Sequence, residues 1–127
     1  MIFEAIIIDD EAPARVELKN QLERTGRVKV VAEAVCLQEG VDKMQRNRID
    51  VAFVDHNISG SNTSILPDAL PTMAKVPMLI YMTAFADVQD DPFGIDPMDY
   101  LVKPVDEEKL DRIVGAIEER YAKEVCS

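Results

Sequence analysis

The first constraint on the fold is an apolar run that ends in three acids. Residues 2–8 read IFEAIII, and Asp9, Asp10 and Glu11 follow directly. A nearly continuous apolar run of this length is typical of a central strand of a parallel sheet, buried on both faces. Because neighbouring carboxylates repel one another, they need a compensating partner where the strand ends. The run therefore predicts an α/β protein with an acidic group at one edge of its sheet.

Four further apolar segments predict additional strands. They lie at residues 28–34, 51–54, 78–82 and 100–102. In the first of them, apolar and polar residues alternate. This is typical of a strand at or near a sheet edge, where one face is less buried than the other. Its apolar positions are Val28, Val30, Ala32 and Ala34.

Segments with apolar residues at helical spacing separate these strands. Helices are predicted at residues 13–26, 37–44, 65–74 and 110–121. The third is the weakest, because Pro67 and Pro71 lie within it. Strands that alternate with helices predict right-handed crossovers and a parallel sheet with helices on both faces.

Length and charge limit the function classes. A chain of 127 residues fits one domain, residues 1–127, and 14 basic against 24 acidic residues give a net charge of -10. Such a domain is repelled by nucleic acid and by anionic lipid. The chain has no apolar run of about 18 residues and no basic leader, which predicts a cytoplasmic location without membrane contact. Cys36 and Cys126 are expected to be free thiols.

Polar side chains follow the predicted strands. They are Asp9 and Asp10, Asp55, Thr83 and Lys103. Functional groups of open α/β sheets lie beyond the carboxyl ends of the strands, so the three carboxylates converge if their strands are neighbours. Oxygen-only ligands suit Mg2+. The Lys103 ammonium group and the Thr83 hydroxyl can each donate a hydrogen bond to a phosphate oxygen. The remaining acid, Asp55, could then act as the nucleophile.

Four short segments at the strand ends form a specific set when taken in order. They are IIIDDE at 6–11, VAFVDHN at 51–57, YMTAF at 81–85 and DYLVKP at 99–104. Together they resemble the receiver domain of two-component response regulators over essentially the whole chain. DDEAPARVELKNQL and PFGIDPMDYLVKP are most similar to receivers of the LytR/AlgR type. The resemblance implies a flavodoxin-like (CheY-like) three-layer sandwich with a five-stranded parallel sheet of order 2-1-3-4-5.

The resemblance also implies a role for each site residue. Asp55 accepts a phosphoryl group. Mg2+ is held by Asp9, Asp10, Asp55 and the carbonyl of Asn57. The residues that bind the phosphoryl group or respond to it are Thr83, Ala84, Tyr100 and Lys103, and the peptide bond before Pro104 is cis. His56 is expected to be a surface or packing residue.

The implied function is a signalling switch rather than an enzyme. A sensor histidine kinase, a phosphotransfer protein or a small phosphodonor supplies the phosphoryl group. The signal passes to a downstream protein or to an output domain outside this chain. A second copy of the chain is a further partner, in a homodimer linked to phosphorylation. The chain departs from the family at Ile58 and Ser59, where Met-Pro is usual, and at Pro92, which interrupts the family's fourth helix.

Two other classes stay open at this point. A metal-dependent phosphohydrolase of similar topology carries Asp-x-Asp at the strand end, whereas residues 55–57 read DHN. A phosphorylation-independent interaction module keeps the fold but loses the switch through the altered loop after Asp55. Steady phosphatase turnover would favour the first class, and failure to acquire phosphate with Mg2+ would favour the second.

Overall fold

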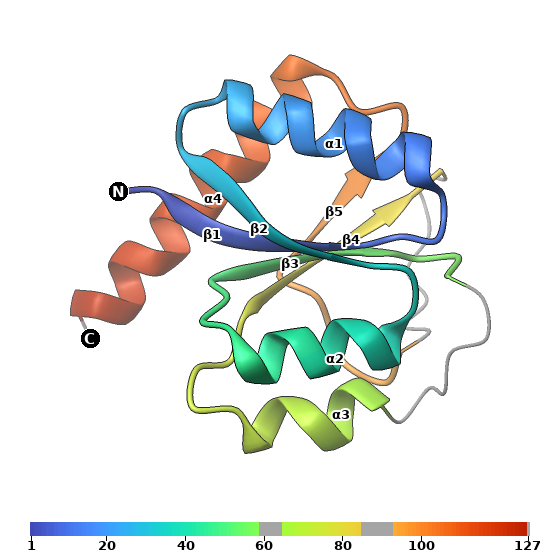
Figure 1. Cartoon of the computed structure of the whole chain (residues 1–127). Coiled ribbons are helices and arrows are strands. Elements are labelled where there is room, and N and C mark those ends of the chain that lie inside the picture. Colours follow the sequence, from blue (N-terminus) through green and yellow to red (C-terminus); the bar gives the residue numbers. More distant parts are fainter. Residues whose placement is uncertain (59–64, 85–92, 127) are drawn as a thin grey trace.

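The computed structural model describes residues 1–58, 65–84 and 93–126. A parallel sheet lies at its centre with helices on both faces (Figure 1). The strands are β1 (Phe3–Ile8), β2 (Val28–Ala34), β3 (Val51–Asp55), β4 (Met78–Thr83) and β5 (Asp99–Val102). They pair in the order β2-β1-β3-β4-β5. The predicted flavodoxin-like sheet is therefore confirmed, with β2 at an edge.

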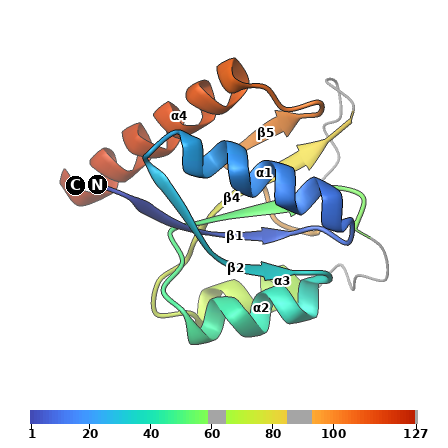
Figure 2. The ribbon, with the colours of Figure 1, turned by 45° about the horizontal axis from the view of Figure 1, so that its top comes forward.

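The helices form the two outer layers. They are α1 (Ala12–Arg24), α2 (Leu37–Arg46), α3 (Ile65–Ala69) and α4 (Glu107–Cys126), with a 3-10 helix η1 (Leu70–Thr72) after α3. Helices α1 and α4 cover one face of the sheet, and α2 and α3 cover the other (Figure 2).

The single helix predicted over residues 65–74 is wrong in its extent. The segment is a five-residue helix followed by η1, which ends at Thr72. Pro71 stands in the first turn of η1 and lacks the N–H that a continuing α-helix would need. The helix that the family places before β5 falls largely on residues 85–92, outside the described residues.

Burial confirms that β1 is a central strand. Its side chains alternate between two apolar cores, one on the α1 and α4 face and one on the α2 and α3 face. Ala5, Ile6, Ile7 and Ile8 are all 0% exposed. The apolar run in the sequence therefore reflects burial on both sides.

Strand β2 contains a bulge that the sequence analysis did not predict. Its register against β1 shifts at Val31, which is inserted between two paired residues. Val30 packs in the core beneath α1, whereas Ala32 and Ala34 pack in the opposite core. The prediction that the alternating residues share one face is thus wrong beyond Val31, because one extra residue reverses every later side chain. Glu33 consequently faces α1.

Two helical glycines are expected to respond oppositely to alanine. A Cβ at Gly40 in α2 would overlap Ile8 Cδ1 and lie 2.9 Å from Ile8 Cγ1, whereas none of the described atoms outside the local chain lies within 4 Å of a Cβ at Gly115 in α4. Alanine removes a backbone entropy cost of about 0.5–1 kcal/mol at either site. Overpacking at Gly40 costs about 1–3 kcal/mol. Thermal unfolding should show a lower Tm for Gly40→Ala and a higher Tm for Gly115→Ala, and equal rises would refute the tight contact between α2 and β1.

Candidate phosphoacceptor site

The structure gathers the polar residues at the carboxyl edge of the sheet. Asp9 follows β1 and Asp55 ends β3, and these two strands are neighbours. Carboxylate oxygens of Asp9, Asp10 and Asp55 lie within 4.8 Å of one another. Asp9 is 1% and Asp55 4% exposed, whereas Asp10 is exposed. Three acids from two strands therefore share one small site.

Lys103 brings a positive charge to this group. Its Nζ lies 3.5 Å from Asp9 Oδ2 and 3.7 Å from Asp55 Oδ1. The backbone N–H of Lys103 donates to the Thr83 carbonyl at 2.7 Å, which holds the ends of β4 and β5 together. One ammonium group thus lies between two nearly buried carboxylates.

The neighbours of Asp55 only partly stabilise the negative charge of its carboxylate. Burial, the largest effect, raises its pKa above the ordinary value of 3.8, and the charge of Asp9 raises it further. The Asn57 N–H donates to Asp55 Oδ1 at 3.1 Å and, together with Lys103, opposes this rise. Because the net shift is upward, the site favours an added positive charge.

The donor chemistry of the site fits a hard divalent cation. The oxygens of Asp9, Asp10 and Asp55 are ligands that Mg2+ prefers, and no softer sulfur or imidazole ligand belongs to this described cluster. Asp9 Oδ1 accepts the Glu11 N–H at 2.9 Å, which orients this carboxylate. A bound Mg2+ would therefore offset the repulsion between the three carboxylates.

The structure describes the segment after Asp55 as far as Ile58. The N–H of His56 donates to the Met82 carbonyl at 2.8 Å, and the N–H of Ile58 donates to the Asp55 carbonyl at 3.2 Å. Ile58 is 6% exposed and packs in the core beneath α2 and α3. Ile58 therefore fills an apolar position at the point where the chain departs from the usual Met-Pro. Residues 59–64, including Ser59, lie outside the described residues.

An aromatic cluster lies between β4 and β5. Tyr100 is opposite Tyr81 in the strand pair, and their rings are 6.1 Å apart at 80°. The Tyr81 ring also meets Phe93 edge-on at 5.2 Å, and its hydroxyl donates to the Ile95 carbonyl at 2.5 Å. Thr83, two residues after Tyr81 on the same face of β4, is 1% exposed. Of these three rings, the sequence pointed only to Tyr100. Tyr81, which contacts it, and Phe93, which contacts Tyr81, were missed, although the two-residue spacing from Thr83 to Tyr81 was a usable signal for Tyr81.

The remaining predicted site residues are placed as follows. Ala84 is exposed just after β4, and the Lys103–Pro104 peptide bond is cis. Cys36 is a free thiol whose sulfur accepts the Glu39 N–H at 3.5 Å and caps α2. The side chain of Cys126 is outside the described part of the chain. Among the described residues, no helix combines the length and the apolar character needed to cross a membrane.

Comparison with known proteins agrees with this geometry. The family model of the response regulator receiver domain matches residues 5–115. The sensory transduction protein LytT of Bacillus anthracis is 33% identical over 109 residues, which cover 86% of this chain and 44% of that protein. The transcriptional regulatory protein LytR of Staphylococcus aureus (strain N315) is 29% identical over 120 residues, covering 94% and 49%. The chain thus spans less than half the length of these relatives.

A solved structure shows the same fold. The REC domain of AraT, a response regulator from Geobacillus stearothermophilus, superposes with a TM-score of 0.80 at 26% identity and covers 98% of both chains. The resemblance to LytR-type receivers that the sequence analysis stated is confirmed by the matches to LytT and LytR. The chain belongs to the response regulator receiver domain family.

Proposed function

We propose that this chain is a phosphoacceptor switch that takes a phosphoryl group onto Asp55 in a Mg2+-dependent reaction. The observation that carries the proposal is the position of Asp55, nearly buried at the end of β3 with Lys103 3.7 Å away and two further acids beside it. A carboxylate with a raised pKa beside a fixed ammonium group can attack an electrophile and then retain a dianionic product.

The proposed step forms a bond between an Asp55 oxygen and phosphorus. It breaks the P–N bond of a phosphohistidine, whose electron pair leaves with the imidazole, or the P–O bond of a small phosphodonor. The positively charged ammonium group of Lys103 donates a hydrogen bond to a phosphoryl oxygen. Asp9, Asp10, Asp55 and the Asn57 carbonyl would hold Mg2+, which supplies further positive charge to the phosphoryl oxygens.

We also propose how the modification changes the surface. The Thr83 hydroxyl and the Ala84 N–H donate to the new phosphoryl oxygens, and Tyr100 moves with Thr83. The contacts of Tyr81 with Tyr100, Phe93 and Ile95 support this route, because they connect β4 and β5 to the segment before β5. A local charge would thereby alter the face formed by β5 and α4.

The partners follow from the family. We propose that the chain is cytoplasmic and that a sensor histidine kinase or a phosphotransfer protein is its phosphoryl donor. The downstream target is an output domain or a separate protein. A phosphorylation-linked homodimer is part of the same proposal. The two named relatives support an output domain, since each is about twice as long as the part that matches this chain.

The test is incubation with acetyl phosphate in the presence of MgCl2, followed by intact mass spectrometry. We expect the gain of one phosphoryl group, and no gain when EDTA replaces MgCl2. No gain with Mg2+ would refute the proposal in favour of an interaction module. Continuous release of inorganic phosphate over many turnovers would favour a phosphohydrolase instead.

The switch has its own test in hydrogen exchange. Beryllofluoride with Mg2+, a mimic of the phosphorylated acid, should change amide protection in residues 93–103 more than in residues 14–47. The expected reason is that only the first segment contains Tyr100 and the contacts of Tyr81. Equal changes in both segments would leave a phosphate-binding site without the proposed route.

A further inference from the structure

Arg15 in α1 makes a contact that the proposed chemistry does not use. Its Nη1 donates to the backbone carbonyl oxygen of Asp9 at 2.6 Å, and its Nε donates to Glu33 Oε1 at 3.3 Å. The Arg15 side chain is 17% exposed. Its guanidinium therefore connects α1 to the end of β1 and to β2.

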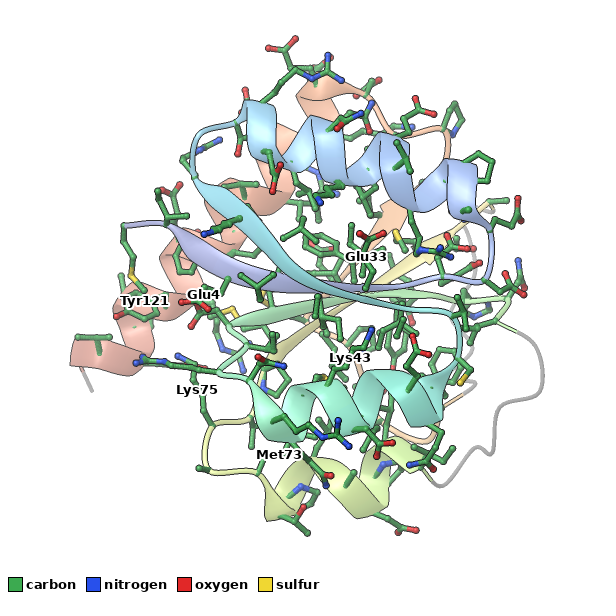
Figure 3. The ribbon with its side chains drawn as sticks, in the orientation of Figure 1. Glu4, Glu33, Lys43, Met73, Lys75 and Tyr121 are labelled. Carbon is green, nitrogen blue, oxygen red and sulfur yellow. The ribbon has the colours of Figure 1, made fainter. Side chains whose placement is uncertain are left out.

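The bulge in β2 makes this contact available. If β2 were regular, with Val31 in place of Ala32 opposite Ile6, Glu33 would face α2, because side chains alternate along a strand. The carbonyl of Glu33 accepts Lys43 Nζ from α2 at 2.5 Å, which holds this part of β2 from the other side. Figure 3 shows Glu33 on the α1 side of the sheet and Lys43 on the α2 side. Glu33 is thus held in place to orient the guanidinium of Arg15.

The carbonyl that Arg15 holds lies within the proposed metal site. It belongs to the peptide unit between Asp9 and Asp10, and a planar peptide fixes the positions of both Cα atoms. The N–H of Asp9 donates to the Ala34 carbonyl at 3.0 Å, so β2 fixes the preceding peptide as well. The backbone that carries the two acids is therefore held on both sides of Asp9.

We propose that Arg15, oriented by Glu33, is a positioning residue for the divalent cation site of Asp9, Asp10 and Asp55. The proposal rests on the cation binding in the proposed function. Outer residues that orient metal ligands typically change metal affinity by about 10- to 100-fold when they are replaced. Arg15 acts through the backbone of Asp9 and touches neither the cation nor the phosphoryl group.

The sign of the effect separates positioning from simple electrostatics. Removing a positive charge near a cation site strengthens cation binding if only Coulomb forces act. Positioning predicts the opposite, because the carboxylates lose their fixed geometry. Lys19 is a matched control: it lies on the same helix and is 4.0 Å from Glu33 Oε2, but no contact joins it to Asp9 in the described structure.

The experiment measures the rise of Tm with MgCl2 concentration at constant ionic strength, with calorimetric titration as a second readout. We expect Arg15→Gln to bind Mg2+ about 10-fold more weakly than the wild type. Lys19→Gln should bind equally well or slightly more tightly. Arg15→Lys keeps the charge without the planar fork that serves two acceptors, and it should also bind more weakly.

Each result decides the proposal. Equal or tighter binding by Arg15→Gln overturns it while the wild type still responds to Mg2+, and so does wild-type affinity in Arg15→Lys. Weaker binding by Lys19→Gln to the same extent would show that the loss does not depend on the contact between Arg15 and Asp9, and it would overturn the proposal too. No response of the wild type to Mg2+ would instead refute the metal site of the proposed function. The metal-free Tm of each variant verifies that it is folded.

Discussion

Asp55→Asn is expected to abolish the gain of a phosphoryl group from acetyl phosphate. The amide has nearly the shape of the carboxylate and keeps an oxygen for the Asn57 N–H, but it is not a nucleophile. Intact mass spectrometry with MgCl2 measures the effect. Asp68→Asn, the same change at an exposed position of α3, is the matched control and should be phosphorylated normally. Phosphorylation of Asp55→Asn to the wild-type extent would mean that another residue is the acceptor.

The same variant should be more stable than the wild type without metal at neutral pH. The folded-state pKa of Asp55 lies above 3.8, so the folded protein binds this proton more tightly than the unfolded chain does. The stability that this provides is present below about pH 4 and is lost as pH rises through the folded pKa. The Tm advantage of Asp55→Asn should therefore grow over that interval, and MgCl2 should reduce it. A lower Tm than the wild type at neutral pH would show that the pKa direction is wrong.

A second large effect is expected at the opposite end of the sheet, where Asp50 precedes β3. Asp50 is 4% exposed, and its Oδ2 accepts the Glu4 N–H at 2.8 Å while Lys75 Nζ lies 2.8 Å from Oδ1. The Asp50 backbone also bonds to Glu4 of β1 and Met78 of β4. Lys75 Nζ lies 5.8 Å from the ring centroid of Tyr121 in α4. Figure 3 shows Glu4, Lys75 and Tyr121 gathered at this edge.

Asp50→Ala should destabilise the fold by about 3 kcal/mol, because it leaves the Glu4 N–H without its acceptor and Lys75 without its ion-pair partner. For a domain of this size, Tm should fall by roughly 10 °C. Lys75→Met should cost less, since Asp50 keeps the hydrogen bond from Glu4. Phosphorylation should persist in both variants, as the site lies at the other edge of the sheet. A loss below about 1 kcal/mol for Asp50→Ala would refute this network.

The strands of the sheet and the polar residues at their carboxyl ends could be predicted from the amino-acid sequence alone. Buried parallel strands are apolar throughout, so β1 was recognisable, and acids at strand ends must meet when the strands are neighbours. The sequence therefore identifies the candidate site residues Asp9, Asp10, Asp55, Thr83 and Lys103. The alternation of side chains along a regular strand and the residue at which the strand ends are local properties, so they can be predicted from the sequence.

The residues that hold those side chains in place could not be predicted, because they meet only in the folded chain. Val31 suits a regular strand and a bulge equally well, yet the bulge determines whether Glu33 faces Arg15 or the opposite helix. Asp50, just before β3, and Lys75, between η1 and β4, likewise form an ion pair only once β3 and β4 lie side by side. Such contacts depend on three-dimensional packing between elements. A bulge is defined by how one strand pairs with its neighbour, so the pattern of alternating side chains in a single strand does not reveal it.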